Sequence, residues 1–248
     1  TDADSVAIRF DEAVTVTAED YLLHNGGEPE AASACEYGDS PDCIVVTLAS
    51  IVAPGKPCML DGRAQDEAGN SITFSVPLWG YNESPARLII NEILCQGSST
   101  RPDWVEFRVL AGGNLAGLCC AVGSLNDYEH RYVFPNRLVE SGDYVVLHLK
   151  PLGNPLEKDE LDAKDQSGGM DANTLAWDFW YRGDGGGLPG SNGAVSLALS
   201  PMGAYEDALL YSDRTSASDE KYRGFGTAAM LARADAINAA AMWLAAGA

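Results

Sequence analysis

The chain has few cations and no long apolar run, and both absences exclude classes of function. Its 248 residues contain 16 Lys and Arg against 36 Asp and Glu, which gives a formal net charge of −20 at pH 7. A chain with this balance repels phosphate backbones and anionic membrane surfaces at long range. No uninterrupted apolar run approaches the roughly 20 residues that a membrane-spanning helix needs. The sequence therefore predicts no nucleic-acid partner and no transmembrane segment.

The six cysteines lack the C-x-x-C spacing that is typical of zinc sites, so they favour disulfides and an oxidising compartment. Cys35 and Cys43 flank a short turn that could bring their Cα atoms together, and we expect them to form a disulfide. The chain begins Thr-Asp-Ala-Asp-Ser-Val, without the regions of a secretory signal. We expect an exported protein, periplasmic or at the cell surface, and a lipid anchor upstream of Thr1 stays an open alternative.

Short strand patterns separated by turns organise the first third of the chain. Apolar and polar residues alternate over residues 6–10, which is typical of a half-buried strand. The sequence Asp-Glu-Ala-Gly-Asn at 66–70 has turn chemistry and separates two further strand patterns. Residues 77–85 contain two prolines, a glycine and an asparagine, which is the composition of a linker. These observations predict a first domain over residues 1–82.

A second domain over residues 86–248 combines further strand patterns with one polar stretch and one helical pattern. Residues 151–187 are acidic, glycine-rich and without periodicity, so we expect an elaborated surface loop. Residues 227–245 are rich in alanine and place apolar side chains at helical spacing, which predicts a C-terminal helix.

Sequence segments in a fixed order carry a family resemblance. They are LIINEIL at 88–94, DWVEF at 103–107, NLAGL at 114–118, ESGDYVVL at 140–147, GSNGAVSLALSP at 190–201 and DALLYSD at 207–213. In this order they resemble a lamin-tail domain of the bacterial, exported type, although Leu118 stands where that family usually has an aromatic residue. FDEAV at 10–14, PGKPCML at 54–60 and DEAGN at 66–70 resemble a bacterial immunoglobulin-like domain. The resemblances imply an all-β protein with two immunoglobulin-like β-sandwich domains and a C-terminal α-helix.

Cys119 and Cys120 are neighbours on one of the expected strands, so their side chains point to opposite faces of the sheet. At most one of them should reach Cys95 through the sandwich. The lamin-tail resemblance implies that Leu115, Leu118 and Cys120 are buried, which leaves Cys119 outward. The pairing of Cys58, Cys95, Cys119 and Cys120 stays open.

No motif indicates catalysis, and the lamin-tail resemblance implies attachment and interaction. Only His24, His130 and His148 could supply an imidazole, and we expect each at the surface. The sequence therefore predicts a non-catalytic interaction or scaffold protein. Two alternatives stay open: an accessory fragment of a larger secreted hydrolase, such as a nuclease or phosphatase, and a calcium-dependent adhesin.

Exposed aromatic residues and loop carboxylates are the candidate binding groups. We expect a protein or glycan ligand to be met by aromatic side chains. These are Trp104, Trp177, Trp180 and Tyr181. Asp178 and Asp184 are the weak candidates for a metal site, because the aspartates of the acidic loop do not have the spacing of a calcium-binding loop. We expect no required cofactor.

Overall fold

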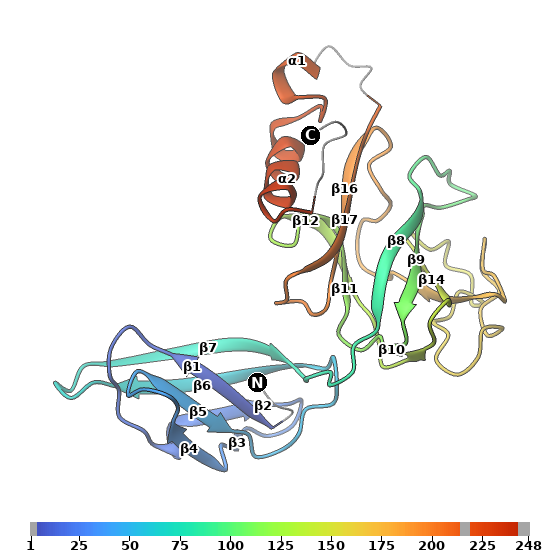
Figure 1. Cartoon of the computed structure of the whole chain (residues 1–248). Coiled ribbons are helices and arrows are strands. Elements are labelled where there is room, and N and C mark those ends of the chain that lie inside the picture. The colour runs from blue at the N-terminus through green and yellow to red at the C-terminus, as the bar shows by residue number, and fades with distance from the viewer. Residues whose placement is uncertain (1–3, 214–218, 243–248) are drawn as a thin grey trace. The chain divides into compact units, whose positions relative to one another are not determined.

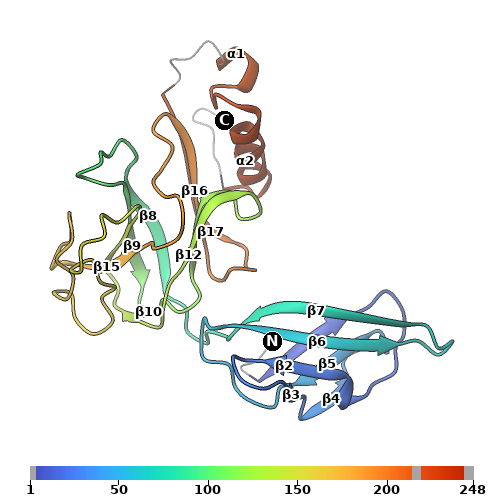
Figure 2. The same cartoon turned by 180° about the vertical axis from the view of Figure 1, so that it is seen from behind.

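The structure is a computed structural model that describes residues 4–213 and 219–242, and it consists mainly of β-strands (Figures 1 and 2). The chain divides into two compact units, Thr1–Glu83 (unit 1) and Ser84–Ala248 (unit 2). Charge is divided unevenly between them, since unit 1 contains fifteen Asp and Glu but only three Lys and Arg.

Unit 1 is built from two antiparallel sheets. The first has the order β1 (Ser5–Arg9), β5 (Cys43–Thr47) and β4 (Ala34–Tyr37). The second has the order β3 (Glu30–Ala31), β2 (Tyr21–His24), β6 (Pro57–Gln65) and β7 (Ser71–Trp79). A single 3-10 turn, η1 (Ala18–Asp20), precedes β2.

Alternating side chains of the two sheets form the core of unit 1. Tyr21 and Leu60 from one sheet and Ile44 from the other are at most 1% exposed. Gly62 of β6 lies between the rings of Tyr21 and Phe74, and a Cβ atom there would lie 2.4 Å from Phe74 Cζ. Glycine at this position therefore allows the two rings to pack over the sheet.

Unit 2 contains two four-stranded sheets and a small two-stranded one. The first sheet has the order β15 (Ala176–Trp180), β14 (Tyr144–His148), β9 (Trp104–Ala111) and β8 (Arg87–Leu94). The second has the order β12 (Tyr128–Val133), β11 (Cys119–Gly123), β16 (Asn192–Ala198) and β17 (Tyr205–Ser212). The small sheet pairs β10 (Gly113–Asn114) with β13 (Leu138–Val139). All of these pairings are antiparallel except that of β14 with β15.

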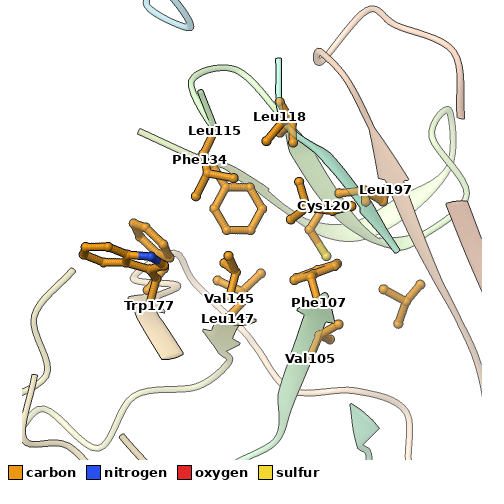
Figure 3. Packing of buried hydrophobic residues seen from close by; sticks show 14 of the residues in the cluster. Val105, Phe107, Leu115, Leu118, Cys120, Phe134, Val145, Leu147, Trp177 and Leu197 are labelled. Atoms are coloured by element: carbon orange, nitrogen blue, oxygen red, sulfur yellow. The ribbon is translucent and has the colours of Figure 1, made fainter. Parts of the chain in front are cut away.

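The core of unit 2 lies between its two large sheets (Figure 3). Leu115, Leu118 and Cys120 are at most 1% exposed in this core, as the lamin-tail resemblance implies. Cys119 points to the other face of β11, but it is also only 1% exposed. The expectation of an outward Cys119 was right about the direction of the side chain and wrong about its exposure, because that face of the sheet is buried as well.

A helix near the C-terminus packs on the second large sheet of unit 2. It is α2 (Ala228–Ala239), and the Thr227 hydroxyl caps it by accepting a hydrogen bond from Met230 N at 3.1 Å. Its buried side chains are Met230, Ala234 and Ile237, which pack with Ala194 and Leu210 of the sheet. A short helix, α1 (Asp219–Tyr222), precedes it. Neither helix of the described residues is long and apolar enough to cross a bilayer.

The all-β fold class with a C-terminal helix is confirmed, and three boundaries differ from expectation. The helix ends at Ala239, six residues before the expected end, and Leu244 lies outside the described residues. Strand β7 continues to Trp79, so the first residues of the expected linker belong to a sheet. The expected loop at 151–187 contains β15, whose residues are all buried. The sequence did not indicate this strand, because β15 has only five residues and polar and glycine-rich residues surround it.

Candidate functional site

Strand β15 carries two of the four aromatic candidates, Trp177 and Trp180, and the metal candidate Asp178, and it lies at the edge of its sheet. A long crossover, residues 149–175, connects it to β14 in parallel. Trp177 and Trp180 are 6% and 1% exposed, so their prediction as contact residues is wrong. The reason is that both faces of β15 are covered: Trp177 belongs to the sandwich core, whereas Trp180 lies beneath the crossover, with its Nε1 donating to Ser167 Oγ at 3.0 Å.

A buried histidine stacks on Trp180. The rings of His148 and Trp180 have centroids 3.9 Å apart and an interplanar angle of 11°. The two residues are partners in the register of β14 and β15, so their side chains lie on the same face of the sheet. His148 is 2% exposed, and the expectation of a surface histidine is therefore wrong. Sequence alternation correctly indicated a strand here, but it could not show that the second face of that strand is covered.

The carboxylate of Asp178 is fully committed to protein partners. Its Oδ1 lies 2.6 Å from His148 Nε2, and its Oδ2 accepts a hydrogen bond from Asn173 N at 2.8 Å. The residue is 0% exposed, whereas Asp184 is exposed. The described residues contain no group of three or more potential metal ligands. Asp178 and Asp184 are therefore in different environments, and the carboxylate of Asp178 already contacts His148 and Asn173 N.

Two acidic residues of the crossover satisfy the outer backbone of β15. Asp178 N donates to Glu160 Oε2 at 2.9 Å, and Trp180 N donates to Asp159 Oδ1 at 2.7 Å. In return, Glu160 N donates to Asp178 O at 2.9 Å. An unpaired buried N–H costs about 1–3 kcal/mol, so these side chains take the place of a neighbouring strand.

Glu160 is the most deeply buried acid of the crossover. Besides Asp178 N, its carboxylate accepts hydrogen bonds from Gln166 N and Ser167 N, both at 3.0 Å. Burial raises the pKa of Glu160, while the three N–H donors act in the opposite direction. A raised carboxyl pKa is a feature of many catalytic acids. Here, however, the group is 0% exposed, and its hydrogen bonds come from backbone N–H groups of the crossover and of β15.

The other face of β15 is fixed by charges around Trp177. The Arg137 guanidinium lies 3.7 Å from the centre of the indole ring, and Trp177 Nε1 donates to Asp143 Oδ2 at 3.1 Å. Lys164 Nζ of the crossover lies 2.6 Å from Asp143 Oδ1. Burial by itself would raise the pKa of Asp143, but hydrogen bonds from Glu140 N, Lys164 and Trp177 together lower it. These contacts tie the crossover to the turn before β14.

The two remaining aromatic candidates are partly accessible. Trp104 lies on β9 and is half-buried, and its indole N–H is buried without a hydrogen-bond partner among the described residues. Tyr181 follows β15 and is also half-buried, with its ring centroid 5.5 Å from that of His130. The structure therefore leaves Trp104 and Tyr181, out of four aromatic candidates, with surface for a ligand.

The predicted disulfide between Cys35 and Cys43 is also wrong. In the ladder between β4 and β5, Cys35 is the partner of Val46, and Gly38 N donates to Cys43 O. The two cysteines are thus three positions apart along the ladder. All six cysteines lie in the described residues and are unpaired. Burial raises the pKa of Cys35 to about 11 and that of Cys119 to about 12, so these thiols are poor nucleophiles.

A cavity lined in part by residues of α2 lies in unit 2. Its volume is about 430 Å³, and its lining includes Glu129, Asn192, Phe225, Met230 and Arg233. Arg233 lies 2.8 Å from Glu129 and 3.2 Å from Asp127, so its charge is neutralised within the unit. No sequence signal pointed to this cavity, because its walls come from segments that are distant along the chain.

Comparisons with known proteins assign a family and indicate no activity. A protein of Treponema pallidum (strain Nichols), described as uncharacterized, is 36% identical over 158 residues, which are 63% of this chain and 39% of that protein. The chain thus spans about two fifths of the length of that relative. The crystal structure of a DUF4876 family protein from Bacteroides thetaiotaomicron VPI-5482 is similar over 79% of this chain and 66% of its own, at 13% identity and a TM-score of 0.27, which is too low to support an inference.

Residues 86–248 match the model of a family designated TP_1001_2nd and described as "protein second domain". The match begins two residues after the start of unit 2 and covers more than half of the chain. The chain therefore belongs to the TP_1001_2nd family.

Proposed function

We propose that this chain is a non-catalytic interaction and scaffold module of an exported protein, acting at the cell surface or in the periplasm. The resemblance of unit 2 to lamin-tail domains and of unit 1 to bacterial immunoglobulin-like domains supports this role. One observation carries the proposal: the buried cluster of His148, Asp178 and Glu160 uses its polar atoms to hold a strand in place.

A catalytic acid or base must come within hydrogen-bond distance of a substrate. His148 is 2% exposed, and Asp178 and Glu160 are 0% exposed. Every oxygen of the two carboxylates accepts a hydrogen bond from a backbone N–H or contacts the imidazole. A buried cluster whose carboxylate oxygens all have partners within the protein contributes to the stability of the fold. This arrangement supports a structural role over a role in hydrolysis.

We further propose a protein or glycan partner and no required cofactor. The accessible parts of Trp104 and Tyr181 are the remaining aromatic contact groups of unit 2. The net charge of −20 disfavours nucleic acid as a partner. Export rests on the two family resemblances and not on the cysteines, which are unpaired in the structure.

The test compares the wild type with His148→Gln in assays of phosphodiester and phosphomonoester hydrolysis. We expect no turnover by either protein, together with a lower free energy of unfolding for the variant, because the substitution removes the ring that stacks on Trp180. Circular dichroism confirms that the variant is folded at the assay temperature. Hydrolysis by the wild type that a folded His148→Gln variant lacks would contradict the proposal.

The partner is tested separately by glycan-array and pull-down experiments with Trp104→Ala. Leu175→Ala is the matched control, because Leu175 is 75% exposed on the same unit. We expect weaker capture with Trp104→Ala and unchanged capture with Leu175→Ala. Equal capture by both variants would remove Trp104 from the proposed contact surface.

A further inference from the structure

Among the strands of residues 4–213, one edge strand lacks the charged side chains or the short length that the other edge strands have. Strands β1, β3, β4, β8, β12, β15 and β17 each contain a charged residue, and β10 and β13 have only two residues each. Strand β7 is the outermost strand of its sheet and has nine residues, none of which is charged (Figures 1 and 2). Long uncharged edges are the ones that pair with other strands.

The hairpin between β6 and β7 determines which backbone groups of β7 point outward. Asp66 N donates to Asn70 O at 2.9 Å at one end, and Gly80 N donates to Lys56 O at 2.9 Å at the other. Because hydrogen-bonded pairs alternate along an antiparallel ladder, the even-numbered residues of β7 bond to β6. The odd-numbered residues, from Ser71 onward, direct their N–H and C=O groups away from the sheet.

These outward backbone groups are free at the centre of the strand. Thr73 and Ser75 are exposed, and their outward N–H and C=O groups have no backbone partner outside the ladder among the described residues. Pro77 has the same parity, so its missing N–H costs no bond to β6. The open part of the edge is therefore the segment from Ser71 to Val76.

We propose that β7 pairs in antiparallel fashion with β7 of a second copy of this chain, about a twofold axis at Phe74. In this register Phe74 faces Phe74 of the other copy, and Thr73 faces Ser75. Thr73 and Ser75 then exchange N–H···O bonds across the axis, and Pro77 falls opposite Ser71 at the end of the pairing, where a missing donor matters least.

The side chains of β7 suit this register. Ile72 and Val76 become cross-strand partners on the face that carries the core of unit 1, and Ile72 is 57% exposed in a single copy. Aromatic and β-branched pairs of this kind stabilise antiparallel sheets, and so does the hydroxyl pair of Thr73 and Ser75 on the other face. The strand is thus complementary to itself, which is the requirement of a twofold interface.

Charge also favours a second copy at this edge over other parts of unit 1. Fifteen acidic residues against three basic ones make two copies repel each other, and β7 offers an approach without a charged side chain on the pairing strand. The repulsion of the remaining carboxylates is screened by salt. The dimer should therefore strengthen as the salt concentration rises, which is opposite to the behaviour of an interface that ion pairs hold together.

Sedimentation equilibrium of the full chain tests the proposal, over about 1 μM to 1 mM protein and at about 0.05 M and 0.5 M NaCl. We expect a monomer–dimer equilibrium with a lower dissociation constant at high salt. Thr73→Glu should raise the dissociation constant about tenfold or more, because it places like charges beside the axis. Thr73→Gln is the matched control of the same size without charge, and it should dimerise like the wild type.

Thr73→Pro is the second variant, since it removes an outward N–H without removing a bond to β6. Thermal unfolding of each variant establishes that unit 1 remains folded. A wild type that stays monomeric over the whole range, or a dimer that Thr73→Glu leaves intact, would overturn the proposal. A dimer that weakens as salt is added would also overturn it.

Discussion

The edge strands β15 and β7 both have outward backbone N–H groups that no neighbouring strand accepts. They differ in what those N–H groups contact. At β15 the outward N–H groups of Asp178 and Trp180 donate to carboxylates of the crossover, and every residue of the strand is buried. At β7 the corresponding groups of Thr73 and Ser75 are open and no charged residue is present. At β15 the carboxylates of Glu160 and Asp159 thus take the place of a neighbouring strand, whereas β7 has no such side chains and its edge is open for pairing.

The largest effect should come from removing the acid that closes β15. We expect Glu160→Ala to lower the free energy of unfolding of unit 2 by about 3–5 kcal/mol, because three buried N–H groups lose their acceptor. Urea unfolding measures the change. Glu140→Ala is the matched control, since Glu140 is exposed and should change stability by less than about 0.5 kcal/mol. Equal effects of the two substitutions would mean that the crossover does not close the edge.

A smaller effect should come from adding a methyl group at Gly62 of β6, beside the Phe74 ring of β7. Gly62→Ala places a Cβ atom 2.4 Å from Phe74 Cζ and should destabilise unit 1 by about 1–3 kcal/mol through forced repacking. Gly27→Ala is the control, because a Cβ atom at Gly27 has no heavy atom within 4 Å. Thermal unfolding distinguishes the two variants. If Gly62→Ala also weakens the proposed dimer, the position of Phe74 matters for both the core and the edge.

The turn before β14 should make unit 2 sensitive to acid. Asp143 has a lowered pKa in the folded state, so its contribution to stability is present above the ordinary Asp value and is lost as the pH falls below about 4 through the folded pKa. Asp143→Asn should lower stability at pH 7 and flatten the pH dependence in that range. Glu160 works in the opposite sense, since its raised pKa favours the folded state on protonation. A variant with the acid dependence of the wild type would show that Asp143 is not responsible.

The smallest effect should be that of a reducing agent. Because all six cysteines are unpaired in the structure, dithiothreitol should leave the unfolding midpoints of both units unchanged. Differential scanning calorimetry with and without the reductant tests this expectation, and mass spectrometry of an unreduced digest is the control. A Cys35–Cys43 peptide in that digest would show that the ladder between β4 and β5 can shift by several residues.

Local patterns in the sequence indicated many of the strands and the terminal helix, but not β15. Alternation at Val105 and Phe107, turn chemistry at 66–70 and helical spacing from Met230 to Ile237 are local signals, and each needs only neighbouring residues to be read. The carboxylates of the acidic stretch were also visible in the sequence. Their roles were not, because a side chain that accepts a backbone N–H 18 residues away leaves no periodic pattern.

Which faces of those strands are covered depends on contacts between segments that are distant along the chain. Trp180 and His148 follow the same alternation as an exposed strand, but the crossover packs on them and removes them from solvent. The same holds for Cys35 and Cys43, whose separation depends on the register of a ladder and not on the length of the turn between them. Burial and register are set by contacts between distant segments, and the sum of those contacts, rather than any single segment, determines which polar groups remain available for function.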